Sequence, residues 1–483
     1  MAQQAGFQQN LPPTIDIPLI GLPLQRGTGT GDQRYVNVIF EKIKNPLTGG
    51  ETAYVIKRPG LENFSQPPAG AAVGRGLYYW KGSDKIYSVF GDKLYSNTTE
   101  KATLATSTGR VWFTETSPTS STRLLIVSDG TDLYHIETND TVTQIDENDD
   151  AQFPQANLGC VVFFDTYIFL GQSDGEIWNT DPDDFINWVG TATEDADSYG
   201  DELVALARQR DQIVALGGFS TEFYFDNGTT PSPLLRIQQN SLTMGCAHKN
   251  SVAAAGDYLV WVGQCPAQGL GGRSVWLLDN LDARKVSTPV IERFLNAEGS
   301  SISSCTAWIE SVGGHILYVL NLSSANRTFV YDLEMKMWSE WSDTTGTAKF
   351  PGLAATSDDD GVVYVQDAAN GRIYKLLTTI YQDSASNFPV ILQTDNYDFG
   401  TPFAKFQDGL WLVGDNGTST ISVAEADDDY ATFNTGRDLD ITATRKFLPE
   451  GGMFFSRAYK LTYTQNAPLR LQKLVLKLTV GNS

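Results

Sequence analysis

The sequence predicts an all-β protein built on a β-propeller of six or seven blades, with an extended arm before it and a β-sandwich-like domain after it. Three observations support this prediction. The composition is typical of strands and turns, with 44 Gly, 20 Tyr and 24 Phe among 483 residues. Helical periodicity is nearly absent. A pattern of short strands and tight turns recurs along the middle of the chain.

The clearest copy of this pattern is GLYYWKGSDKIYSVFGDKLYS, at residues 76–96. It predicts strands at Leu77–Trp80, Lys85–Phe90 and Lys93–Ser96. The turn-forming residues at 82–84 and 91–92 separate the three runs. A unit of this size is one small antiparallel sheet.

Six similar units follow, and in each of the seven the second strand of a hairpin ends near an aromatic residue. These aromatics are spaced 39 to 55 residues apart: Tyr95, Tyr134, Trp178, Tyr224, Trp276, Tyr331 and Tyr374. A period of about 40–50 residues with several short strands per unit is typical of propeller blades. Each small sheet has two apolar faces, which packing around a ring buries. Because the spacing is unequal and no motif is fixed, an array of β-sandwiches or a solenoid remains the alternative.

The flanking regions lack this rhythm and predict three domains. Residues 1–70 form a Pro- and Gly-broken arm with one strand or two, residues 71–380 the propeller, and residues 381–483 a C-terminal β domain. The Gly-rich stretch RGTGTGDQ at 26–33 lacks the Lys-Ser/Thr pair of a phosphate-binding loop and predicts a flexible linker. We expect the arm and the C-terminal domain to serve assembly.

Charge and composition argue against several classes of protein. The chain carries 35 Lys and Arg against 57 Asp and Glu, a formal charge of −22. A general nucleic-acid-binding protein needs the opposite sign, because its affinity comes mainly from neutralising phosphates. No apolar run reaches the ~20 residues of a membrane span, and the N-terminus does not resemble a secretion signal. The four Cys are widely spaced and predict buried thiols of a protein made in a reducing cytoplasm.

No residue is predicted to be catalytic, to bind a cofactor or to bind a metal. The three His have no His or Cys partner at ligand spacing. The main enzymatic alternative is a carbohydrate-binding or glycan-cleaving propeller of the sialidase type, which needs carboxylates and an Arg cluster at the centre of one face. Glu176, Glu222 and Asp332 lie on or beside predicted strands, but nothing in the sequence pairs them. We therefore expect no enzymatic activity.

Three acidic runs stand out along the chain. The simplest interpretation is that they are solvated loops. The more specific hypothesis is that some of them face DNA and repel its phosphates. The residues concerned are Asp149, Asp150, Asp358, Asp359, Asp360, Asp427, Asp428 and Asp429.

Several segments, taken in order, resemble a phage family: the packaged-DNA stabilisation proteins of short-tailed phages, also called tail accessory factors or nozzle proteins. The segments are RYVNVIF at 34–40, VIKRPGLENF at 55–64, the hairpin at 76–96, GFSTEFYF at 218–225 and the Gly-rich stretch around 245–278. The resemblance covers roughly residues 30–380. The last ~100 residues match no motif of the family.

The resemblance implies a structural virion protein of a phage tail, made in the host cytoplasm. Such proteins form a homohexameric ring of six-bladed propellers below the portal and the head-to-tail adaptor. The ring extends the DNA channel, retains packaged DNA, lets it pass on ejection, and in some phages holds tail fibres, a tailspike or a needle. An acidic wall suits a channel that must not bind DNA. Tyr35 and Phe40 of the arm are candidates for contact with a neighbouring subunit or the adaptor; alternatively, they close the first blade.

Overall fold

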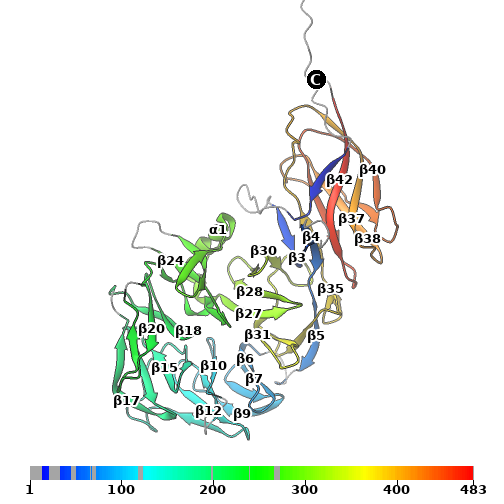
Figure 1. The fold of residues 1–483 in the computed structure, drawn as a ribbon. Coiled ribbons are helices and arrows are strands. Elements are labelled where there is room, and N and C mark those ends of the chain that lie inside the picture. Colours follow the sequence, from blue (N-terminus) through cyan, green and yellow to red (C-terminus); the bar gives the residue numbers. More distant parts are fainter. Residues whose placement is uncertain are drawn as a thin grey trace, which may run out of the picture. The chain divides into compact units, whose positions relative to one another are not determined.

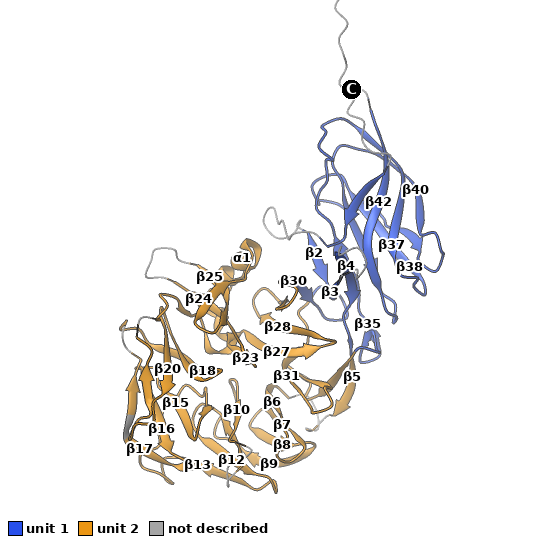
Figure 2. Ribbon diagram, in the orientation of Figure 1, with its two compact units in different colours: residues 1–60, 337–347, 378–483 blue, residues 61–336, 348–377 orange. Residues whose placement is uncertain are grey.

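The computed structural model describes residues 14–20, 33–44, 51–65, 67, 72–117, 123–196, 199–238, 240–265 and 272–481. The linker predicted at 26–33 lies outside these residues except for Gln33. The chain divides into two compact units (Figure 2). Unit 1 comprises residues 1–60, 337–347 and 378–483, and unit 2 comprises residues 61–336 and 348–377. The sequence analysis separated the arm from the C-terminal domain, whereas the structure groups the described residues up to 60 with those after 377.

Unit 2 contains, within its described ranges, seven small antiparallel sheets made of consecutive strands (Figure 1). The first four sheets are β6 (Gly74–Trp80), β7 (Lys85–Phe90), β8 (Lys93–Ser96) and β9 (Thr99–Thr103); β10 (Trp112–Glu115), β11 (Leu124–Ser128), β12 (Leu133–Glu137) and β13 (Val142–Ile145); β14 (Val162–Phe164), β15 (Tyr167–Gly171), β16 (Glu176–Asp181) and β17 (Asp184–Asp195); and β18 (Leu203–Gln209), β19 (Gln212–Gly217), β20 (Thr221–Asp226) and β21 (Leu234–Arg236).

The remaining three sheets follow the same order. They are β22 (Gly245–Cys246), β23 (Ala253–Ala255), β24 (Tyr258–Gln264), β25 (Arg273–Asp279) and β26 (Asp282–Lys285); β27 (Thr306–Val312), β28 (His315–Leu322) and β29 (Arg327–Asp332); and β31 (Gly352–Ser357), β32 (Val363–Asp367) and β33 (Ile373–Leu377), with β5 (Gly60–Ser65) beside β33. Between the fifth and sixth sheets lie the helix α1 (Pro289–Ala297) and the 3-10 turn η3 (Gly299–Ser304), which the sequence analysis did not predict.

The seven sheets form a series that returns to its start. The first strand of each sheet, or β23 in the fifth sheet, contacts that of the next. The series runs from β6 through β10, β14, β18, β23 and β27 to β31, and β31 contacts β6. A linear array or a solenoid would leave its first and last sheets apart. The all-β prediction is confirmed, and the sheets have the arrangement typical of a propeller.

The apolar core of unit 2 lies between neighbouring sheets. One cluster joins Trp80 and Tyr87 of the first sheet with Leu125 of the second. Another joins Leu77 of the first sheet with Ile373 of the last. Each sheet therefore buries both of its faces against neighbours, which is what keeps so many short strands stable.

The described residues of unit 1 form two main sheets, which we call sheets A and B. Sheet A has the order β3 (Val38–Lys44), β4 (Glu51–Lys57), β42 (Arg470–Val480), β37 (Lys405–Gly414) and β40 (Phe447–Phe454), and β1 (Ile15–Pro18) also pairs with β42. In sheet B, β30 (Met337–Trp341), β2 (Arg34–Val36), β36 (Val390–Gln393), β41 (Ala458–Tyr463), β38 (Thr420–Ala426) and β39 (Arg437–Asp440) lie side by side. The short hairpin β34 (Gln382–Asp383) and β35 (Ser386–Asn387) belongs to the same unit.

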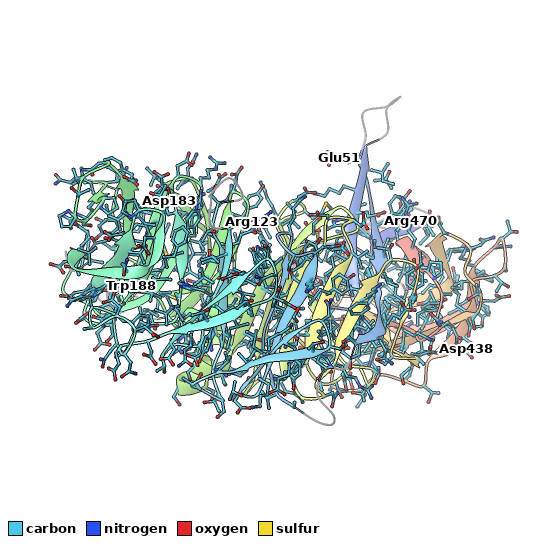
Figure 3. The ribbon with its side chains drawn as sticks, turned by 90° about the horizontal axis from the view of Figure 1, so that it is seen from below. Glu51, Arg123, Asp183, Trp188, Asp438 and Arg470 are labelled. Carbon is cyan, nitrogen blue, oxygen red and sulfur yellow. The ribbon has the colours of Figure 1, made fainter. Side chains whose placement is uncertain are left out.

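Sheets A and B face each other across a buried layer. Residues of β42 alternate between buried and more exposed positions, as expected of a strand with one face in the core. The Tyr459 hydroxyl of sheet B donates a hydrogen bond of 2.7 Å to Gln407 Oε1 of sheet A. The β3–β4 hairpin extends from this body, and Figure 3 shows Glu51 at its far end.

Candidate functional site

The surroundings of the three histidines are those of residues that stabilise the fold. Burial lowers the pKa of His135 and of His248 to about 4. His248 Nδ1 accepts a hydrogen bond from the Asn250 backbone N–H, and His315 Nδ1 lies 2.8 Å from Asp332 Oδ2. Among the described residues, no group of three or more His, Cys, Asp or Glu is placed to hold a metal ion.

The carboxylates weighed for the glycan-cleaving alternative lie in different sheets. Glu176 accepts a hydrogen bond from Trp178 Nε1 in the third sheet (3.0 Å), and Asp332 contacts His315 in the sixth. Glu222, in the fourth sheet, accepts hydrogen bonds from the Tyr224 hydroxyl (2.9 Å) and Arg236 Nη1 (3.3 Å). The structure does not bring these three carboxylates together.

A cavity of about 480 Å³ lies beside Glu222 and is lined also by Tyr199, Arg236 and Ser241. Burial, followed by the charge of Asp195, raises the pKa of nearby Glu194. The cavity borders β20 and β21, the two strands of their sheet furthest from the ring's first strands. The cavity is lined by one Arg and does not lie at the centre of a propeller face. It therefore lacks the cluster of Arg and carboxylates that the glycan-cleaving alternative requires.

The middle of the propeller is filled by the segment around η1 (Lys249–Ser251). Arg110, which precedes the second sheet, donates hydrogen bonds of 3.2 Å to the carbonyls of Asn250 and Val252. From the other side, the Tyr318 hydroxyl donates to the Ser251 carbonyl at 2.9 Å. Because the second sheet does not neighbour the fifth, these bonds cross the ring. We call residues 248–252 the plug around η1, because these bonds hold the segment across the middle of the ring.

Most carboxylates of the predicted acidic loops accept hydrogen bonds or form ion pairs with nearby groups. Asp150 accepts hydrogen bonds from the backbone N–H groups of Gln152 and Trp188, the latter labelled in Figure 3. Asp358 accepts hydrogen bonds from backbone N–H groups of its own turn and from the Tyr364 hydroxyl. Asp359 forms an exposed ion pair with Lys81.

The third acidic run lies in unit 1. Asp427 forms a bidentate ion pair with Arg457, Asp428 accepts from Thr432, and Asp429 accepts from Asn396. The side chains of Asp149, Asp360 and Asp429 are exposed. A role of any of the acidic runs in repelling DNA stays a prediction.

Tyr35 and Phe40 are buried in unit 1, where their rings meet edge to face at 5.1 Å. They lie on β2 and β3 and take no part in the first sheet of the propeller. Contact with another subunit stays a prediction, and it would require these side chains to leave their present positions.

An exposed apolar patch in unit 1 was missed by the sequence analysis. Phe406 of β37 lies opposite Met453 of the edge strand β40, and Phe403 and Phe455 lie just beyond these strands. All four side chains are between 43% and 58% exposed. We call them the β37–β40 patch. A pattern of alternation alone did not reveal it, because exposed and buried apolar residues look alike in a sequence.

A buried ion pair was also missed. Arg58 Nη2 and Nη1 lie 2.6 and 3.1 Å from the two carboxylate oxygens of Asp383, and Arg58 is fully buried. Arg58 Nε donates to Asn37 Oδ1 at 2.9 Å, and the guanidinium lies 3.8 Å from the centre of the Phe388 ring. Its neighbour Gly60 cannot carry a side chain, because a Cβ would lie 2.3 Å from the Gln382 carbonyl. This cluster explains the Arg-Pro-Gly motif at 58–60 without a ligand.

Comparison with known proteins gives one family. The family model described as bacteriophage P22 Gp10, beta-propeller, matches residues 21–381. No curated protein sequence matches.

Among solved structures, a streptogramin B lyase is 12% identical, over 67% of this chain and 97% of that one, with a TM-score of 0.41. A virginiamycin B lyase from Staphylococcus aureus is 10% identical, over 67% of this chain and 98% of that one, with a TM-score of 0.42. Likenesses this distant carry no argument about activity.

Proposed function

Because this chain belongs to the family of the bacteriophage P22 Gp10 β-propeller, we propose that it is the nozzle or tail-tube subunit of a short phage tail. Family membership supports a structural protein of the phage tail, and therefore a place in the virion. The match covers both the propeller and part of unit 1, so it rests on most of the described fold. We further propose that the protein acts without enzymatic activity and without a cofactor.

We propose that the subunits form a ring, a homohexamer as the family resemblance implies, attached to the head-to-tail adaptor. The ring would extend the DNA channel, retain packaged DNA and let it pass on ejection. The plug around η1 supports a channel between subunits, because the middle of each propeller is occupied. We also propose that each propeller has seven blades, from the seven sheets whose first strands contact in turn. Tail fibres, a tailspike or a needle are the expected distal partners.

The net charge of −22 supports a channel wall that does not hold DNA. A wall rich in Lys and Arg would bind the phosphates and slow ejection. Two units with separate cores suit a subunit that offers one rigid body to the channel wall and a second to assembly.

The test is electron microscopy of the purified protein alone and mixed with the adaptor protein of the same phage. We expect closed rings with a central channel wide enough for duplex DNA, at least in the mixture. Compact monomers in both samples would overturn the proposal of a ring. A channel wall dominated by Lys and Arg in the resulting map would overturn the proposal of a repelling wall.

A further inference from the structure

The N-terminal strand β1 occupies a slot on sheet A. It pairs antiparallel with β42, with Asp16 opposite Val475 and Ile17 opposite Leu474. Ile17 and Leu19 are 1% and 2% exposed, and the Leu19 backbone N–H donates to the Gln472 carbonyl at 3.1 Å. Two apolar anchors and a short ladder thus hold this strand.

The slot would be an open strand edge without β1. The same edge of β42 pairs with β4 only at Leu471 and Arg470. β1 covers the next stretch, from Lys473 to Leu476, while the other edge of β42 is paired along its length with β37. An uncovered edge with two empty apolar sites favours the addition of a strand.

Charge adds selectivity to this contact. Asp16 Oδ2 lies 2.5 Å from Lys473 Nζ, on the exposed side of the pair of strands. Apolar anchors on one side and an ion pair on the other fix both the register and the direction of the added strand.

The sequence connects β1 to the rest of the chain through a long link. Residues 21–32 separate Ile20 from Gln33 and include the run Arg26–Asp32, RGTGTGD. Twelve residues span at most about 40 Å when extended. Such a reach allows the same strand to enter the slot of a second copy. In a closed ring, every copy would then donate one strand and receive one, so no edge stays bare.

We propose that, in the assembled ring, residues 14–20 of each subunit leave their own sheet A and pair with β42 of the neighbouring subunit. This rests on the proposed ring. The exchanged contact is the one seen within the single chain, so the exchange needs no new complementary surface and changes mainly the entropy of the link. The arm becomes the element that ties adjacent subunits together.

The test uses two chains, each with one introduced cysteine, in a Cys265→Ser background that removes the least buried native thiol. One tagged chain carries Asp16→Cys and the other chain carries Val475→Cys, positions that face each other across the β1–β42 pair. The two are mixed, with the Val475→Cys chain in large excess so that nearly every tagged chain has it as its neighbour, before assembly on the adaptor and then oxidised. We expect most of the tagged chain in a disulfide-linked dimer on a non-reducing gel.

The control is a second split pair, Thr420→Cys and Asp440→Cys, which face each other in the β38–β39 hairpin, where both residues are exposed. This pair should not link different chains. A double variant with both Asp16→Cys and Val475→Cys in one chain shows that the disulfide can form.

Ring formation is measured separately by mass photometry and electron microscopy. Rings without a disulfide between chains, while the double variant forms it within one chain, would overturn strand exchange and leave the proposed ring standing. Absence of rings on the adaptor would overturn the proposed ring, and strand exchange with it.

Discussion

Single residues set the stability of unit 1 where its chain segments meet. Arg58 brings together Asn37 and Asp383, which lie far apart in the sequence. A charge taken fully out of water is tolerated only when it is paired and hydrogen-bonded. Arg58 meets this condition with hydrogen bonds to Asn37, to Asp383 and to backbone carbonyls, and with the aromatic face of Phe388.

Replacement of Arg58 by Ala should therefore strongly destabilise unit 1. It leaves the Asp383 carboxylate buried without its partner, which costs about 3–5 kcal/mol. Urea denaturation of the full chain, followed by Trp fluorescence, measures the loss. The matched control is Lys81→Ala at an exposed ion pair with Asp359, which should change stability by less than about 1 kcal/mol. Equal effects of the two variants would contradict this role of Arg58.

Lys57 gives the same unit a dependence on pH. Burial, followed by the charge of Arg58, lowers the pKa of Lys57 to about 8. The unfolded chain keeps this proton up to a pKa of about 10.4. Between these values the unfolded state binds more protons, so the contribution of Lys57 to stability rises with pH.

The rise should disappear in Lys57→Met. The stability difference between wild type and variant is measured by urea denaturation from pH 7.5 to about 10, the range in which Lys57 titrates. The exposed Lys477→Met serves as control and should run parallel to wild type. A difference that stays constant across this range would refute the assignment.

At the scale of elements, the blades share a turn built on an aspartate. Asp367 Oδ1 accepts from the backbone N–H groups of Ala369 and Asn370, two and three residues further on. Asp129 and Asp332 make the same pair of bonds in the second and sixth sheets. The turns at Asp129 and Asp367 join the second and third strands of their sheets, whereas the turn at Asp332 joins β29 to β30. A turn that rests on one Asp explains why the repeat is weak as a motif.

Asp367→Ala should destabilise unit 2 by about 1–3 kcal/mol, because it removes the acceptor of three hydrogen bonds. One of these is the buried bond from the Tyr374 hydroxyl, at 2.9 Å. The corresponding Asp174 of the third sheet makes one longer bond, of 3.3 Å. Asp174→Ala should therefore cost less than about 1 kcal/mol. Thermal unfolding of both variants decides, and the idea fails if Asp174→Ala is the more damaging change.

The plug around η1 depends on a bond network that crosses the ring. Arg110→Ala removes two hydrogen bonds and a guanidinium that lies 4.1 Å from the centre of the Trp112 ring. We expect the amides of Ser251 and Val252 to exchange hydrogen faster in the variant, as measured by mass spectrometry. Peptides from β11 should be unchanged. Unaltered exchange at residues 248–252 would mean that Arg110 does not hold the plug.

On the scale of the whole molecule, charge decides how a ring of these subunits meets DNA. Asp149→Lys together with Asp360→Lys reverses two exposed acidic loops. If these loops face the channel, the assembled variant should gain affinity for duplex DNA at low salt. The logarithm of its binding constant should then fall linearly with the logarithm of the salt concentration, with a slope of about −0.9 for each phosphate contacted. Fluorescence anisotropy measures both.

The control for this charge reversal is Asp282→Lys, an exposed position outside the acidic runs. No gain over this control would remove Asp149 and Asp360 from the channel wall.

None of the helices in the described residues is long and apolar enough to cross a membrane.

The local elements of the propeller were predictable because they depend on short-range rules. The strands expected at Lys85–Phe90 and Lys93–Ser96 are β7 and β8. Tyr95 lies on the third strand of its sheet, as the first copy of the pattern indicated. Trp178 and Tyr374, expected on the second strand of a hairpin, also lie on third strands, because each sheet has one more strand before the hairpin. The candidate assembly residues were less predictable, since Tyr35 and Phe40 are buried and the β37–β40 patch is exposed, while their residue types are alike.

By itself, the sequence determined the all-β class, the hairpins and the repeating sheets, because turn chemistry and alternation act between residues close in the chain. Only the tertiary structure decided that β1, β4 and β42 share one sheet, that Arg58 meets Asp383, and that the η1 segment fills the ring. These contacts join residues hundreds of positions apart or across a ring. No local pattern encodes them, because they arise only when separate apolar faces and buried charges find partners in the folded chain.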